Sequence, residues 1–322
     1  MDRIITDKLI RSLNKICPNR VKTNQYLSDI SSWRIGGVAD CIVEPAGVEE
    51  LQNVIKLARE EKIPTVVFGA ATNLLFADEG LRALGICIGK HMSQVIIRGN
   101  TVVAQAGAWV PLLARKVGNA GLAGCEHIVG IPGTIGGLVY MNGGSKRKNI
   151  GANVQSVTGI DFDGKVFEMT CSECKFSYRS SVFQQETTQK IITKVTMQFH
   201  EKGNPSEIRR RMLDILAERR KKFPKEHPNC GSVFLSDPNV YQQYGAPGLV
   251  IEECGLKGLR MGGAEISTKH ANFIVNIGGA TAQDVLELIK YIQAIVYEKT
   301  GLLIRSEVRY VSECGIILPI NV

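Results

Sequence analysis

The feature that most constrains the fold of this chain is a glycine-rich segment in its middle third, which runs from Gly130 to Gly144. Glycines permit positive φ angles and let a ligand approach the backbone closely, while a proline stiffens a turn. The positions with such properties, or with a polar side chain beside them, are Gly130, Pro132, Gly133, Thr134, Gly136, Gly137 and Asn142. We therefore expect this segment to line the site of a large, flat ligand that carries phosphate.

A second segment of the same kind follows a predicted buried strand over 65–68. It consists of Gly69, Ala70, Ala71, Thr72 and Asn73. Successive backbone N–H groups in such a turn form a concave anion site, which can hold a diphosphate. Taken alone, such a segment is more often an ordinary tight connection. Neither segment is a GxGxxG or Walker motif, so a Rossmann NAD site and a P-loop are both disfavoured.

Hydrophobic periodicity predicts a chain that alternates between strands and helices. We expect helices over 48–61, 111–120 and 281–297, and a further helix that Asn204 caps and Pro205 begins. Strands are expected over 40–44, 65–68, 191–199 and, as a closing strand, 304–311, with hairpins over 95–106 and 154–166. Composition and pattern change together near Gly69 and near Gly203, which predicts domain limits at these two places.

Composition restricts the partners of the chain. The chain has 322 residues, of which 44% are apolar, and a formal net charge of +8. That charge favours anionic ligands without identifying one. No helix-turn-helix, zinc-finger or RNA-binding motif accompanies it, so we do not expect nucleic acid as a partner.

The cysteines and the N-terminus indicate the compartment. The one close cysteine pair, Cys171 and Cys174, lacks a second pair or suitably spaced histidines, which favours reduced thiols over a zinc site. We expect no bound metal. The N-terminus alternates charged and apolar residues, and no apolar run approaches the ~20 residues that span a bilayer. These patterns predict a soluble, cytoplasmic protein that does not enter a membrane.

Several segments, in order along almost the whole chain, resemble those of the UDP-N-acetylenolpyruvoylglucosamine reductase family, the FAD-dependent second enzymes of muramic acid synthesis. The segments are WRIGG at 33–37, GIPGTIGG at 130–137, YMN at 140–142, YRSS at 178–181, GSVF at 231–234, EECGLKG at 252–258, HANFIVN at 270–276 and EVR at 307–309. Each one is weak alone, and their order and spacing carry the resemblance. We find no counterpart of the extra tyrosine loop in the family's longer type, so the chain resembles the shorter type.

The resemblance implies an α+β chain with a vanillyl-alcohol-oxidase-type FAD-binding fold. Two α+β subdomains, expected over 1–68 and 69–203, would hold FAD without a covalent bond, and a C-terminal α+β substrate domain over 204–322 would close over the substrate. NADPH would reduce the flavin, which would then reduce the enolpyruvyl ether of a nucleotide sugar. We expect the enzyme to act as a monomer.

The resemblance also implies site residues. Arg179 and Glu307 would stabilise negative charge that develops beside the substrate carboxylate, with Glu307 protonated and its pKa raised. Ser232 would donate the proton that completes the reduction, and Tyr178 and Lys225 would bind substrate. From the residues alone, Arg179 would be a loop ion-pair partner, Ser232 a turn residue and Glu307 a residue on the solvated face of a strand.

The sequence departs from the family pattern in places that bear on FAD and substrate. The first glycine loop contains Ala70 and Ala71 where the family has glycine, and Lys146, Arg147 and Lys148 add positive charge near the expected flavin pocket. Residues 234–238 read FLSDP where the family has FKNP, so a lysine that would bind diphosphate is absent. Lys225, or its neighbours Lys221 and Lys222, would replace it.

Two further alternatives follow from these departures. His127 stands where an aromatic residue is common, and Cys125 or His127 could attach FAD covalently, although a packed loop histidine is the better interpretation. Other functions also stay open: a related reductase for another nucleotide sugar, an FAD-dependent oxidase, or a flavoprotein without catalysis. The presence of Arg179, Ser232 and Glu307 together disfavours the last two.

Overall fold

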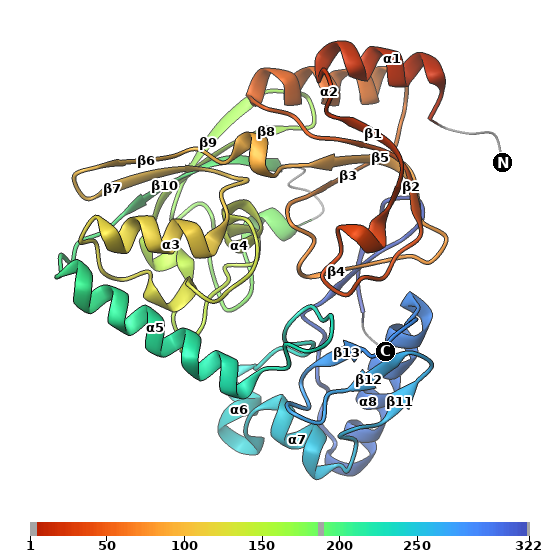
Figure 1. Cartoon of the computed structure of the whole chain (residues 1–322), viewed down its shortest axis with the longest axis vertical. Coiled ribbons are helices and arrows are strands. Elements are labelled where there is room, and N and C mark those ends of the chain that lie inside the picture. Colours follow the sequence, from red (N-terminus) through yellow and green to blue (C-terminus); the bar gives the residue numbers. More distant parts are fainter. Residues whose placement is uncertain (1–4, 186–189, 321–322) are drawn as a thin grey trace.

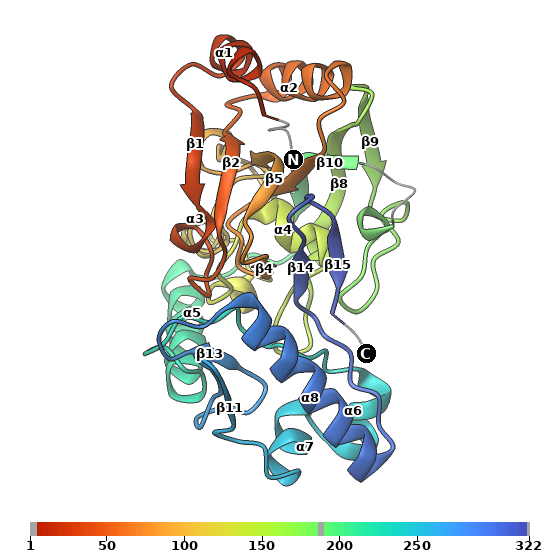
Figure 2. The ribbon, with the colours of Figure 1, turned by 90° about the vertical axis from the view of Figure 1, so that its right-hand side faces the viewer.

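The computed structural model describes residues 5–185 and 190–320 of the chain. Two sheets with their helices form an upper body, and the C-terminal third forms a separate lower unit (Figure 1). A sheet segment near the C-terminus returns from the lower unit to the upper body (Figure 2).

The first sheet has the strand order β1–β2–β5–β3, in which β1 is antiparallel to β2 and the other strands are parallel. Its strands are β1 (Val21–Tyr26), β2 (Val38–Val43), β3 (Thr65–Phe68) and β5 (Leu81–Cys87). Helices α1 (Asp7–Ile16) and α2 (Val48–Glu60) lie above it. The apolar stripe of α2, with Leu51 and Val54, packs against the sheet because these residues recur at helical spacing.

The second sheet is antiparallel throughout, with the order β6–β7–β10–β8–β9. Its strands are β6 (Val95–Arg98), β7 (Thr101–Gln105), β8 (Val154–Asp161), β9 (Val166–Thr170) and β10 (Lys190–Gln198). Below it lie α3 (Val110–Asn119), α4 (Ile135–Tyr140) and α5 (Pro205–Lys222). Helix α4 contacts β7 and β10, which places the main glycine-rich segment directly under the sheet.

The lower unit combines a small sheet with three helices. The sheet contains β11 (Arg260–Met261), β12 (Ala264–Ile266) and β13 (Ile274–Asn276), and the helices are α6 (Pro238–Tyr244), α7 (Pro247–Glu253) and α8 (Ala282–Thr300). The upper body, by contrast, also contains short 3-10 helices, namely η1 (Leu27–Asp29), η2 (Lys90–Met92), η3 (Glu126–Ile128), η4 (Ile150–Asn153) and η5 (Val182–Gln184). The buried side of α8, with Val285, Leu288 and Ile292, forms the centre of a core of its own.

The C-terminal segment ties the lower unit to the first glycine loop. Strand β14 (Arg309–Val311) runs parallel to β4 (Leu74–Phe76), and β15 (Ile317–Pro319) pairs antiparallel with β14. Because β4 begins directly after Asn73, this pairing brings the end of the chain beside the predicted diphosphate loop.

Most predicted elements are confirmed, with one clear error. The side chain of Asn204 accepts a hydrogen bond from the N–H of Ser206 at 2.9 Å, as expected of the cap of α5. The predicted closing strand over 304–311 is wrong for 304–308, because only 309–311 reaches a strand partner. Residues 305–307 instead cross between the units and bond to residues 233–235.

The packing does not follow the predicted divisions at residues 69 and 204. Strand β5 pairs with β2 and β3, so the first sheet continues to Cys87. Helix α5 buries Ile208 and Met212 against α3, in the core of the upper body rather than that of the lower unit. The packing therefore favours divisions near residues 88 and 222.

Across residues 5–185 and 190–320, no helix combines the length and the apolar character that crossing a bilayer requires.

Candidate active site

A cavity of about 570 Å³ lies where the two glycine-rich loops, the second sheet and the C-terminal third meet. Its size is within the usual range of about 300–1,000 Å³ for a ligand site. The predicted site residues that line it are Gly69, Ala70, Ala71, Thr72, Asn73, Pro132, Gly133, Thr134, Gly136, Gly137, Arg179, Ser232 and Glu307. The fold thus brings five separate parts of the sequence, at 69–73, 132–137, 179, 232 and 307, to one site.

The first glycine loop presents a row of free backbone donors. Within the described part of the chain, the N–H groups of Ala70, Ala71, Thr72 and Asn73 have no protein acceptor. Ala71 has a φ of +50°, and a left-handed residue in such a turn directs successive N–H groups toward one side. This is the donor arrangement that a diphosphate requires.

The two glycine-rich loops touch at positions where a larger residue would not fit. A Cβ atom on Gly69 would collide with the hydroxyl of Thr134, so glycine is required for this contact. The hydroxyl of Thr72 donates to the carbonyl of Pro132 at 3.1 Å, and Gly133 has a φ of +144°. The loops therefore form one continuous wall.

Gly130 and Asn142 support this wall from behind, contrary to the direct cofactor contact expected for them. The side chain of Asn142 donates to the carbonyl of Ser177 at 2.7 Å and accepts from the N–H of Gly151 at 3.0 Å. A Cβ atom on Gly130 would collide with the side chain of Arg219. Neither residue lines the cavity.

Arg179 and Glu307 form an ion pair at the cavity wall. The Nε atom of Arg179 donates to Glu307 Oε1 at 2.9 Å, and its Nη2 atom donates to the carbonyl of Gly144 at 3.0 Å. Arg179 has a φ of +51° at the tip of the Ser177–Ser180 turn. Non-glycine residues held in this region often occur at functional sites, because the surrounding structure must maintain the strain.

The environment of Glu307 favours its neutral form more than an ordinary glutamate site does. Burial raises the pKa of Glu307, and the positive charges of Arg179 and Arg309 oppose this shift. This is the direction that the resemblance implies for Glu307. The residue does not lie on the solvated face of a strand, because β14 begins only at Arg309.

Ser232 and Glu307 are held in neighbouring segments. The N–H of Glu307 donates to the carbonyl of Val233 at 2.7 Å, and the side chain of Asn73 donates to the carbonyl of Glu307 at 3.0 Å. The Ser232 hydroxyl lines the cavity and has no hydrogen-bond partner among the described residues. Asn73 therefore links the diphosphate loop to both candidate catalytic segments.

Tyr178 and Lys225 lie outside the cavity lining. The Tyr178 hydroxyl accepts a hydrogen bond from the N–H of Ser236 at 3.0 Å, and its ring lies 5.3 Å from the guanidinium carbon of Arg179. Tyr178 thus orients Arg179 and fixes the segment that departs from the family pattern. Lys225 is exposed and is not brought to the cavity.

Three cations that sequence reasoning did not assign line the cavity: Lys190, Arg219 and Arg309. Arg219 stacks on Phe223, with its guanidinium carbon 4.7 Å from the ring centre, and it forms no ion pair with a described residue. Arg309 donates to Gln184 Oε1 at 3.0 Å. A sequence signal existed for Arg309, which ends a family motif, whereas the contact of Arg219 with Gly130 is visible only in the structure.

The basic triplet at 146–148 does not line the cavity. Lys146 pairs with Glu218 of α5 at 2.5 Å, and Arg147 lies over the ring of Tyr241 at 5.6 Å. None of the three residues lines the cavity, so the expected added charge at the flavin pocket is absent from its wall. Cys125 and His127 are buried and also lie outside the lining.

The residues that line the cavity fit FAD. Free N–H groups at 70–73 match its diphosphate, and the flat wall of glycines at 133–137 accommodates a planar ring system close to the backbone. Sequence comparison agrees: residues 39–170 match the FAD binding domain family. The fold and the site therefore define a flavin-dependent oxidoreductase.

The comparisons also identify the particular family. Residues 223–311 match the C-terminal domain of UDP-N-acetylenolpyruvoylglucosamine reductase. The chain is 42% identical over 98% of its length to UDP-N-acetylenolpyruvoylglucosamine reductase 1 of Corynebacterium glutamicum, covering 93% of that protein. It is 38% identical over 92% of its length to the reductase of Syntrophomonas wolfei, covering 96% of that protein.

A solved structure shows the same similarity in three dimensions. The crystal structure of the UDP-N-acetylenolpyruvylglucosamine reductase of Thermus caldophilus superposes with a TM-score of 0.75 at 32% identity, and covers 90% of this chain and 98% of that one. The chain belongs to the UDP-N-acetylenolpyruvoylglucosamine reductase family, which acts in peptidoglycan precursor synthesis. The expected family, fold class, FAD cofactor and enzyme class are thereby confirmed.

Proposed function

We propose that this enzyme uses NADPH to reduce the enolpyruvyl ether of UDP-N-acetylglucosamine enolpyruvate, giving UDP-N-acetylmuramate. The observation that carries the proposal is the meeting of Arg179, Ser232 and Glu307 in one cavity with the diphosphate loop. FAD, held by the N–H groups at 70–73 and the glycine wall at 133–137, would supply hydride transfer from the nicotinamide to the vinyl carbon of the substrate. The side chains of the cavity must then stabilise charge and supply one proton.

Arg179 and Glu307 stabilise the charge that hydride addition places beside the substrate carboxylate. The Arg179–Glu307 bond holds the guanidinium in one orientation, so its remaining donors are fixed before substrate arrives. A substrate carboxylate beside Glu307 adds a second negative charge to an already buried acid, which raises the Glu307 pKa further. Glu307 then binds the substrate as a neutral hydrogen-bond donor.

Ser232 donates the proton to the carbon that bears the developing charge. Ser232 lines the cavity and its hydroxyl has no hydrogen-bond partner among residues 5–185 and 190–320, so its O–H bond is available to the substrate. A serine hydroxyl is a weak acid, and the positive charges of Arg179 and Arg309 at the cavity lower the cost of its transient deprotonation.

Arg219 takes the place that was expected for Lys225 in binding the substrate diphosphate. It is a cavity-lining cation without a carboxylate partner among the described residues, and its planar group can make paired hydrogen bonds to phosphate oxygens. Tyr178 acts by holding Arg179 and residue 236 in place. The substrate is a small nucleotide sugar, and we propose a monomer in the cytoplasm that needs neither nucleic acid nor a membrane.

An anaerobic experiment tests the proposal directly. The FAD-loaded enzyme is reduced with NADPH and mixed with UDP-N-acetylglucosamine enolpyruvate, while the flavin absorbance near 450 nm is followed. We expect rapid reoxidation and one equivalent of UDP-N-acetylmuramate. Reduction by NADPH without reoxidation would reject this substrate and favour a related reductase for another nucleotide sugar.

A further inference from the structure

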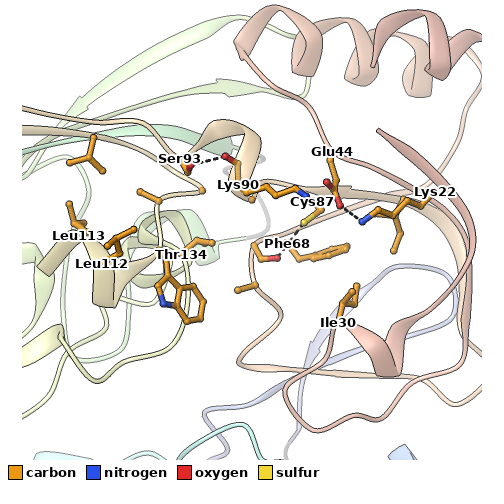
Figure 3. A pocket seen from close by; sticks show the side chains of 18 of the residues that line it. Lys22, Ile30, Glu44, Phe68, Cys87, Lys90, Ser93, Leu112, Leu113 and Thr134 are labelled. Atoms are coloured by element: carbon orange, nitrogen blue, oxygen red, sulfur yellow. Dashed lines mark hydrogen bonds and ion pairs between the residues drawn. The ribbon is translucent and has the colours of Figure 1, made fainter. Parts of the chain in front are cut away.

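A second cavity, of about 600 Å³, lies on the opposite side of the wall that bounds the FAD site. It opens between α3 and the first sheet, with Leu112 and Leu113 on one side and Lys22 and Glu44 on the other (Figure 3). Trp109 also lines this cavity. The two cavities share only Phe68, Gly69, Ala70 and Thr134 among their lining residues. The second cavity therefore has a largely different lining and borders the diphosphate loop at Gly69 and Ala70.

The walls of this second cavity suit an aromatic ligand. Phe68 and Leu113 supply a buried apolar floor, while Trp109 and Leu112 keep 42% and 48% of their surface exposed. Exposed large apolar side chains around a concavity of this size are typical of a ligand site rather than of an ordinary surface. A planar ring that packs against Trp109 would remove this surface from water.

The charges at the rim select an anion. Lys22, Lys90 and Lys116 line the cavity, against the single carboxylate of Glu44, which leaves an excess of positive charge. Lys22 pairs with Glu44 at 2.6 Å. Lys90 and Lys116 form no ion pair within the part of the chain that the structure describes. Lys90 belongs to η2 and Lys116 to α3.

The backbone of the shared wall connects the two cavities. Gly69 and Ala70 contribute to both, and the thiol of Cys87, which lines the second cavity, donates to the carbonyl of Gly69 at 3.6 Å. A ligand packed here would restrict the loop whose N–H groups face the FAD diphosphate. Any such effect is reciprocal, because two ligands that bias one segment change each other's affinity equally.

We propose that the second cavity binds a small planar aromatic anion, and that its occupancy slows the release of FAD. The ring packs between Trp109 and Phe68, and the anionic group lies between Lys90 and Lys116. The site is thus a regulatory ligand site, distinct from the cavity where the substrate is reduced.

Calorimetric titration of the FAD-loaded full chain tests the binding, with 8-anilinonaphthalene-1-sulfonate as the aromatic anion. We expect the double substitution Lys90→Gln and Lys116→Gln to raise the dissociation constant of this probe about tenfold. The matched control, Lys165→Gln with Lys202→Gln, removes two exposed lysines elsewhere and should leave it unchanged. The neutral probe N-phenyl-1-naphthylamine should be insensitive to both double variants.

Two further measurements test where the probe binds and whether its binding affects FAD release. Arg219→Gln alters the FAD-side cavity and should leave sulfonate binding unchanged; loss of binding there would place the probe at the active site and reject the proposal. In the parent chain the probe should slow FAD dissociation by at least about threefold, and it should have no effect in the Lys90/Lys116 variant. Unchanged affinity in that variant, or unchanged or faster FAD release, would overturn the inference.

Discussion

The Nε atom of Arg179 lies 2.9 Å from Glu307 Oε1, although 128 positions separate the two residues in the sequence. The bond joins the turn at 177–180 to the segment that leads into β14, so it closes one side of the active cavity. The Nε atom that makes this bond has no equivalent in lysine. The Nη2 atom of the same side chain donates to the carbonyl of Gly144.

Replacement of Arg179 by lysine should therefore impair turnover severely. A single ammonium cannot keep both bonds and still donate to a substrate carboxylate. We expect flavin reoxidation by substrate to slow by at least about 100-fold, or about 2.7 kcal/mol, with flavin reduction by NADPH nearly unchanged. Stopped-flow absorbance measures both steps. Arg305→Lys, in an exposed pair with Asp237, is the control, and near-normal reoxidation in Arg179→Lys would contradict the assigned role.

Ser232→Ala should separate the two half-reactions still more sharply. The variant lacks the proposed proton donor but keeps the backbone bonds of its segment, because those bonds use the Val233 carbonyl. We expect NADPH to reduce its flavin at the normal rate and substrate to reoxidise it at least about 1,000-fold more slowly. Ser236→Ala, on the same segment, should reoxidise normally. Loss of both half-reactions in a folded, FAD-loaded Ser232→Ala protein would refute the assignment.

The local features of the fold were predictable from sequence, because they depend on near neighbours. The cap at Asn204, the buried stripe of α2 and the strand over 65–68 all follow from periodicity and capping residues. The irregular structure of residues 304–308 was not predictable from sequence. Their apolar residues alternate as in a strand, and their position between two units prevents regular pairing. The predicted division at residue 204 coincides with the start of α5, but the apolar face of α5 packs onto α3 in the upper body, which the sequence does not reveal.

The site shows the same limit. The glycine loops and the motif residues Arg179, Ser232 and Glu307 could be named from sequence because motifs preserve them. Arg219 could not be named from sequence, because its place at the cavity depends on which face of a basic helix meets Gly130. The basic triplet at 146–148 was expected near the flavin pocket, but none of its residues lines the cavity. Proximity in sequence to the glycine segment suggested the flavin pocket, whereas two of its side chains bind Glu218 and Tyr241.

The two alanines in the first glycine loop should respond oppositely to glycine substitution. Ala71 holds a φ of +50°, which costs an L-residue about 1–2 kcal/mol, whereas Ala70 has no positive φ. Added chain entropy in the unfolded state costs each glycine variant about 0.4–1 kcal/mol. We expect Ala71→Gly to be at least as stable as the parent and about 1 kcal/mol more stable than Ala70→Gly. Urea unfolding of the FAD-free proteins measures this, and equal stabilities would contradict the strained loop.

His127 should make the stability of the protein depend on pH. It is 4% exposed and neither ring nitrogen has a partner among the described residues. Burial, aided by the charge of Lys148, lowers the His127 pKa to about 4 from its ordinary value of 6.5. The unfolded chain therefore binds a proton before the folded one as the pH falls. The stability associated with neutral His127 is fully present above about pH 6.5 and is lost between 6.5 and 4.

The His127→Phe variant tests this sign and size. A shift from 6.5 to about 4 corresponds to about 3 kcal/mol over the whole window, of which about 2 kcal/mol falls between pH 7.5 and pH 5. We expect urea unfolding to show that loss in the parent chain and in His200→Phe, which alters an exposed histidine, but not in His127→Phe. At pH 7.5 the His127→Phe protein should also be more stable by about 1 kcal/mol, because it no longer buries an unpaired N–H group. An equal pH slope in all three proteins would mean that His127 is solvated in the native state.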